Sequence, residues 1–94
     1  MALTRGNFGG YEFDRMVVLF SMVDGQREVP CAVSTSAMDG LEKATRIRPD
    51  QREEQFMRLR DQIESRAAQK FIAREFEGTP PGIILRGLDF RHDG

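Results

Sequence analysis

The chain has 94 residues, and 14 lysines and arginines stand against 15 aspartates and glutamates, for a formal net charge of −1. This length allows one domain with a modest core and excludes two lobes with a cleft between them. Near neutrality excludes a global basic field that would concentrate nucleic acid or anionic lipid, so such a partner would need a local patch.

Cellular context can be inferred from the apolar runs and the cysteine count. The longest purely apolar run covers residues 16–20, far short of the roughly 20 residues of a membrane-spanning helix. Residues 1–10 lack the long apolar segment of a signal peptide. The single cysteine, Cys31, excludes an internal disulfide and is typical of a reducing compartment. We therefore expect a cytoplasmic protein with no membrane partner.

The glycines near the start set the expected domain limits. Residues 1–10 contain Gly6, Gly9 and Gly10 and little to bury, which predicts a flexible lead-in. A single domain is expected over residues 11–90, followed by a C-terminal tail over residues 91–94.

Two strands are predicted at residues 15–23 and 28–33, joined at Asp24-Gly25. Side chains alternate between the faces of a strand, so the pairing register can be tested by parity. If opposed residue numbers sum to 49, every inward position is apolar. The opposed pairs are then Phe20 with Val29, Val18 with Cys31, and Met16 with Val33. This register predicts that Cys31 is buried.

Pro30 constrains the second strand, because proline has no N–H to give to a sheet ladder. We therefore predict that this strand lies at an edge of the sheet. A four-residue loop over residues 23–26 would point the nitrogen of Pro30 outward.

Hydroxyl residues follow the second strand and predict a short helix ending near residue 43. Any of Ser34, Thr35 and Ser36 can cap it, and Ser36 with Asp39 resembles a capping box.

A longer helix is predicted from a cap at Asp50 to about residue 74. Its evidence is a run of apolar residues at steps of three and four: Phe56, Leu59, Ile63, Ala67 and Phe71.

The last element is a strand at residues 83–85, after a segment rich in helix breakers. The order strand-strand-helix-helix-strand predicts an α+β fold of two layers, a small antiparallel sheet with the helices packed on one face. The first strand is expected to be central, because residues 17–20 are apolar on both faces, and the last strand is expected beside it.

Several of these positions resemble a small bacterial family, catalogued as domain of unknown function 1488. The matching residues are Tyr11, Glu12, Arg15, Val18, Phe20, Ser34, Ala37, Met38, Phe56, Arg60, Ile63, Glu64, Ala67, Lys70, Asp89 and Phe90. The resemblance covers residues 11–90. It implies a two-layer α+β fold with an antiparallel sheet and no assigned activity.

Few residues point to catalysis or to a metal. A nucleophilic Cys31 would need a base, and the only histidine, His92, lies near the end of the chain. One cysteine and one histidine cannot supply the usual three or four protein ligands of zinc. The glycine cluster at residues 6–10 precedes a strand, whereas a phosphate loop follows one. We expect no enzyme, metal or cofactor, and an enzyme built on Cys31 is kept only as a hypothesis.

Basic residues fall on or beside the apolar stripe of the long helix: Arg52, Arg60, Arg66, Lys70 and Arg74. Glu54, Asp61 and Glu64 are expected toward solvent. The four basic residues from Arg60 on form the candidate binding surface. This basic margin has two interpretations. It could bind an anion, a phosphate backbone or an acidic partner. Alternatively, the basic heads could meet acids of the strands and the C-terminal segment: Glu12, Asp14, Glu28 or Asp89. The second is favoured, because the chain is neutral and shows no aromatic stacking platform.

The resulting hypothesis is a non-enzymatic interaction or regulatory domain. Its candidate mode is homo-oligomerisation through an exposed strand edge or through Val17 and Leu19 on the outer sheet face. The alternative is weak nucleic-acid or anion binding through the basic margin.

Overall fold

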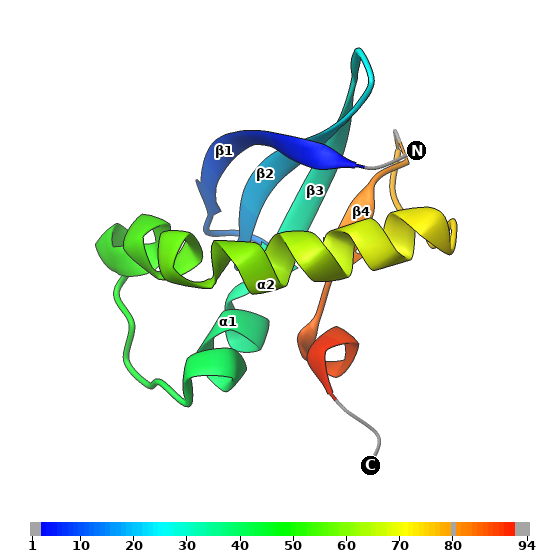
Figure 1. Ribbon diagram of the computed structural model, residues 1–94. Helices are drawn as coiled ribbons and strands as arrows, with labels where there is room; N and C mark the ends of the chain where they lie inside the picture. Colours follow the sequence, from blue (N-terminus) through cyan, green and yellow to red (C-terminus); the bar gives the residue numbers. More distant parts are fainter. Residues whose placement is uncertain (1–2, 80, 92–94) are drawn as a thin grey trace.

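The protein is a two-layer α+β domain, seen in a computed structural model that describes residues 3–79 and 81–91. One four-stranded sheet, in the order β1-β2-β3-β4, is covered on one face by two helices (Figure 1). The predicted fold class is confirmed. The elements are β1 (Thr4–Glu12), β2 (Val17–Asp24), β3 (Arg27–Ser34), α1 (Thr35–Glu42), α2 (Arg52–Ile72) and β4 (Ile83–Leu85), with 3₁₀ turns at Pro49–Gln51 and Gly87–Phe90.

Strand β1 occupies most of the segment for which the sequence predicted a flexible lead-in. It pairs antiparallel with β2, and its register shifts twice, between Arg5 and Phe8 and between Phe8 and Gly10. A Cβ on Gly6 would lie 2.5 Å from the Ser21 carbonyl oxygen, and Gly10 has φ +106°. The glycines thus allow close strand approach and local bulges, which the sequence pattern alone did not distinguish from mobility.

The β2-β3 hairpin has the predicted parity but a different register. Phe20 pairs with Cys31 and Val18 with Val33, so opposed numbers sum to 51 rather than 49. The loop is the two residues between Asp24 and Arg27, where Gly25 has φ +64°. A shift of two residues keeps every side chain on its face. Cys31 is therefore buried, as predicted, although its partner and the loop were predicted wrongly.

The prediction that Pro30 marks an edge strand is wrong. Strand β3 lies inside the sheet, between β2 and β4. Asp24 and Arg27 close a two-residue hairpin, so the alternating ladder makes Ser21 and Pro30 a pair without hydrogen bonds. The nitrogen of Pro30 then points toward β4. Strand β4 begins only at Ile83, opposite Cys31, so no ladder bond from residue 30 is required.

The strand order also differs from the prediction that the last strand lies beside the first. Strand β4 runs parallel to β3, and β1 takes the position beside β2. The helices and the loops between them provide the long crossover that parallel neighbours need. Central placement of β2 follows the prediction, because both of its edges are paired.

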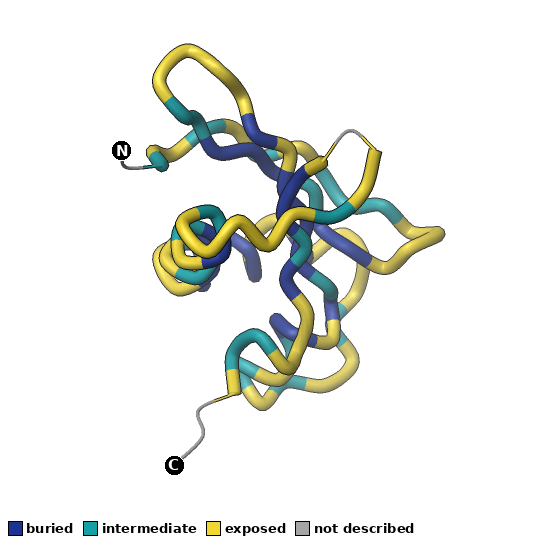
Figure 2. The backbone as a smooth tube through the Cα atoms, turned by 90° about the vertical axis from the view of Figure 1, so that its right-hand side faces the viewer, coloured by how far each residue is buried: buried dark blue, intermediate teal, exposed yellow. Residues whose placement is uncertain are grey.

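Helix α2 supplies the centre of the core. Phe56 is fully buried, and its ring lies 5.1 Å from that of Phe20 and 5.5 Å from that of Phe8. Seen end-on in Figure 2, α2 lies to one side of the strands. Among the described residues, neither helix has the length and hydrophobicity needed to cross a membrane.

Ser34, one of the three hydroxyl residues predicted as a cap, is confirmed, whereas the Ser36–Asp39 capping box and the cap at Asp50 are wrong. The Ser34 hydroxyl caps α1 by accepting from the Ala37 N–H at 3.1 Å, and Asp39 is instead bound to Arg52. A 3₁₀ turn covers Asp50, so α2 begins at Arg52. Its C-terminal end closes with Arg74 at φ +59°, two residues after the helix ends.

Candidate functional site

Cys31 is a residue of the hydrophobic core. Its side chain is buried among the residues that α2 covers, and its Sγ lies 3.5 Å from the Val29 carbonyl oxygen. Burial raises the pKa of the Cys31 thiol to about 12, so at neutral pH the thiol is protonated and a poor nucleophile. The other residue of the catalytic hypothesis, His92, lies outside the described residues.

Across residues 3–79 and 81–91, no three side chains of His, Cys, Asp or Glu come together as a metal ion would require.

The first residue of the basic margin, Arg60, faces inward and fastens α2 to β1. Its guanidinium contacts Glu64 at 2.8 Å, donates to the Gly6 carbonyl at 3.2 Å and lies 5.6 Å from the centre of the Phe56 ring. Arg5 of β1 bonds the same Glu64 at 2.8 Å. Glu64 is therefore buried between two arginines, and the prediction that it faces solvent is wrong. The sequence signal for the Arg60–Glu64 ion pair was the i,i+4 spacing of the two residues.

Lys70 and Arg66 hold the C-terminal segment against α2. The ammonium of Lys70 lies 2.9 Å from the Ile84 carbonyl oxygen and 3.2 Å from Asp89 Oδ1, and the two side chains are only 6% and 7% exposed. Arg66 donates to the Asp89 backbone oxygen at 2.6 Å. Asp89 is one of the acids that the sequence offered as a partner for the margin.

Arg74 differs from the other three. It is exposed, lies in the left-handed region and makes no ion pair with the residues that the structure describes. Arg66 and Lys70 thus meet at Asp89, whereas Arg60 binds Glu64 and the Gly6 carbonyl. Arg74 joins neither group. The basic margin is largely a set of structural clamps, because its charges are already bonded inside the molecule.

A further charge network, which the sequence did not indicate, joins α1 to the start of α2. Arg52 lies 2.7 Å from Asp39 Oδ1, and Gln55 donates to the same oxygen at 2.9 Å. Burial acts to raise the pKa of Asp39, but these two hydrogen bonds more than offset it and lower the pKa overall. A hydrogen bond from Arg58 lowers the pKa of Glu42 in the same way. These partners lie 13 to 16 residues apart, so no local spacing announces them.

The outer face of the sheet carries the two candidate oligomer residues, and they differ. Val17 is only 8% exposed, whereas Leu19 is partly exposed. Leu19 and Pro30 lie between two hollows, of about 210 and 420 Å³. The first hollow continues over Ala32 and Ile84. Leu19, rather than Val17, is therefore available for contact.

Both edges of the sheet are poorly suited to pairing with another strand. The β1 edge is bulged, and the Gly6 carbonyl accepts from Arg60. Strand β4 has three residues, and Glu77 and Gly82 exchange two backbone hydrogen bonds beside its start. Arg86 then bonds Glu77 at 2.8 and 2.9 Å. Bulges, short strands and flanking charges are features that discourage edge pairing.

A four-stranded sheet with helices on one face and clamped charges along α2 defines the class: a small α+β domain with an open outer sheet face. The family of proteins of unknown function DUF1488 matches residues 9–84, and the chain belongs to this family. The resemblance seen in the sequence is confirmed.

The fold is shared with a solved structure. A DUF1488 family protein of unknown function from Shewanella loihica PV-4 is 13% identical, with a TM-score of 0.79. The match covers 90% of this chain and 93% of that one. At this identity the likeness concerns the fold alone. No curated protein matches this chain.

Proposed function

We propose that the protein is a non-enzymatic interaction domain whose outer sheet face binds a second copy of the chain. The observation that carries the proposal is the uncovered apolar centre of that face, at Leu19, Pro30 and Ile84. The helices cover the other face, and these three residues line a hollow of about 210 Å³ that Arg15 and the segment 77–79 border. An apolar surface bordered by polar residues is typical of an interface.

Charge at the two ends of this face favours a second copy over another partner. Arg15 lines the hollow near the start of β2, and Glu28 lies at the opposite end, because β3 runs antiparallel to β2. A two-fold axis that crosses the strands sets Arg15 of one copy over Glu28 of the other, twice. Glu12 bonds two nitrogens of Arg15, which leaves three of its five N–H donors.

The size of the face predicts a weak dimer. The strands have nine, eight, eight and three residues. At about 4.8 Å spacing and about 3.3 Å per residue they give roughly 440 Å² of flat area. A standard interface buries about 800 Å² per partner, so we expect a dissociation constant in the micromolar range. The two edge strands of the sheet, β1 and β4, are not part of the proposal, because both are poorly suited to pairing with another strand.

The test is sedimentation velocity from about 1 to 300 μM, a span that brackets micromolar dissociation. We expect wild type to dimerise and Leu19→Asp to remain monomeric. Leu88→Asp is the matched control, because Leu88 is 67% exposed in the Gly87–Phe90 turn. Its dimerisation should equal that of wild type. A wild-type protein that stays monomeric throughout would overturn the proposal.

Charge reversal tests the orientation without touching the core. Arg15→Glu and Glu28→Arg should each weaken dimerisation about tenfold, since each places like charges together twice. The double variant restores opposite charges and should recover most of the affinity. Additive losses in the double variant would contradict the two-fold arrangement.

Nucleic-acid binding, the alternative from the sequence, finds less support in the geometry. Arg60, Arg66 and Lys70 are bonded within the fold, which leaves Arg74 as the one free cation of the margin among the described residues.

A further inference from the structure

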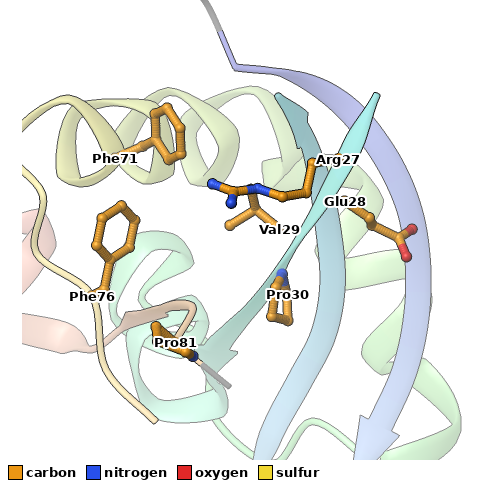
Figure 3. A pocket seen from close by; sticks show the side chains of 7 residues that line it. All are labelled: Arg27, Glu28, Val29, Pro30, Phe71, Phe76 and Pro81. Carbon is orange, nitrogen blue, oxygen red and sulfur yellow. The ribbon is translucent and has the colours of Figure 1, made fainter. Parts of the chain in front are cut away.

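A pocket of about 360 Å³ opens where α2 stops covering the inner sheet face. Its apolar walls are Val29 and Pro30 of β3, Pro81 before β4, the ring of Phe71 in the last turn of α2 and the ring of Phe76 in the segment after it (Figure 3). The rings meet edge to face, with centres 5.7 Å apart. Helix α2 ends at Ile72, so the last part of the inner face lies beyond it. Apolar side chains of that part remain uncovered and form the pocket.

One cation faces this apolar space. Arg27 shares the inner face of β3 with Val29, because side chains alternate along a strand, and its guanidinium extends toward Phe71 (Figure 3). The neighbouring acids do not neutralise it. Glu28 also lines the pocket, but its carboxylate points away from Arg27 (Figure 3) and accepts from the Ser21 hydroxyl at 2.8 Å. Asp24, opposite Arg27 on β2, forms no ion pair with it.

The other charges near this end of α2 leave Arg27 as the cation of the pocket. Arg74 and Glu75 follow the helix and are exposed, and neither lines the cavity. The last carbonyls of α2 accept from the chain itself, the Glu75 N–H bonding the Lys70 oxygen at 2.9 Å. Their negative end is therefore satisfied before any ligand arrives.

From this combination we infer that the pocket binds a small organic carboxylate with an aromatic or branched apolar body. A guanidinium fork holds a carboxylate through two parallel hydrogen bonds, which an amide or alcohol cannot match. The phenylalanine rings and Val29 cover the apolar body. The volume lies at the lower end of the range for small-molecule sites, which limits the ligand to about one ring or one short chain. This pocket adjoins the proposed dimer contact at Pro30 and Glu28, whereas Arg27, Val29 and Phe71 lie outside that contact.

The experiment is an NMR titration of the ¹⁵N-labelled protein with 3-phenylpropionate, and with the uncharged 3-phenylpropanamide as matched ligand. The carboxylate should give saturable shifts at the Val29 and Phe76 amides and at the Arg27 Nε–H, with a dissociation constant of about 1 mM. The amide should bind about tenfold more weakly, because it lacks the charge. Equal binding of the two ligands, or no saturation by about 20 mM, would overturn the inference.

Two variants separate the charge from the apolar walls. Arg27→Gln should weaken carboxylate binding about tenfold and leave amide binding unchanged, whereas Phe76→Ala should weaken both. Arg46→Gln, an exposed arginine that does not line the pocket, is the control and should bind like wild type. An Arg27→Gln protein that binds the carboxylate normally would contradict the assignment. The dimerisation variants Leu19→Asp and Arg15→Glu should leave this titration unchanged, so the two proposals can fail separately.

Discussion

The two faces of the sheet reach low exposure in different ways. On the inner face, Val18 and Phe20 are covered by α2, whose Phe56 packs directly on the strands. On the outer face, Val17 and Ala32 are also buried, at 8% and 5% exposure, although no helix covers them. A residue can therefore have low exposure without belonging to the core. Of the two faces, only the inner one is packed against a helix.

The largest expected effect tests the charges that close the inner face. Asp89→Asn leaves the Lys70 ammonium buried without its counter-charge, and removal of one partner of such a pair costs about 3–5 kcal/mol. Urea unfolding at pH 7 measures the loss. The exposed Glu77–Arg86 pair is the control, and Glu77→Gln should cost under about 1 kcal/mol. Similar losses in the two variants would mean that burial does not distinguish the pairs.

A smaller effect compares the faces with one residue type. Val18→Ala should lower the free energy of unfolding by about 2 kcal/mol, because α2 prevents the cavity from closing. Val17→Ala, the neighbouring position on the outer face, should cost under about 1 kcal/mol, because its site borders solvent. Both are measured at concentrations well below the dissociation constant expected for the proposed dimer, where the monomer prevails. Equal losses of unfolding free energy in the two variants would contradict the claim that only the inner face is tightly packed.

The smallest effect concerns Glu42, whose pKa Arg58 lowers below its ordinary value of 4.5. A carboxylate with a lowered folded pKa stabilises the fold above the unfolded pKa, and the contribution is lost as pH falls through the folded value. At pH 7, Glu42→Gln should therefore be less stable than wild type by about 0.5 kcal/mol. In urea unfolding near pH 3 the difference should shrink. A difference that grows on acidification would show that Arg58 does not stabilise the charged form.

The basic margin shows where sequence reasoning stopped. Its position beside the apolar stripe followed from helical periodicity, and Asp89 was among the acids considered as partners. That Lys70 also donates to the Ile84 carbonyl depends on how the last strand approaches α2. The buried pairing of Glu64 with Arg5 joins residues 59 apart, across a strand that was not predicted. The pocket at Arg27 was missed because it exists only where a helix ends above a strand end.

The sequence by itself determined what is periodic: the apolar stripe of α2, the parity of β2 and β3, and hence the burial of Cys31. Periodicity suffices there because each side chain takes its face from its immediate neighbours. Only the tertiary structure decided which strands are neighbours, that β4 runs parallel beside β3, and that the glycine-rich start forms β1. These depend on contacts between distant residues, and a local pattern of two or four residues carries no information about them.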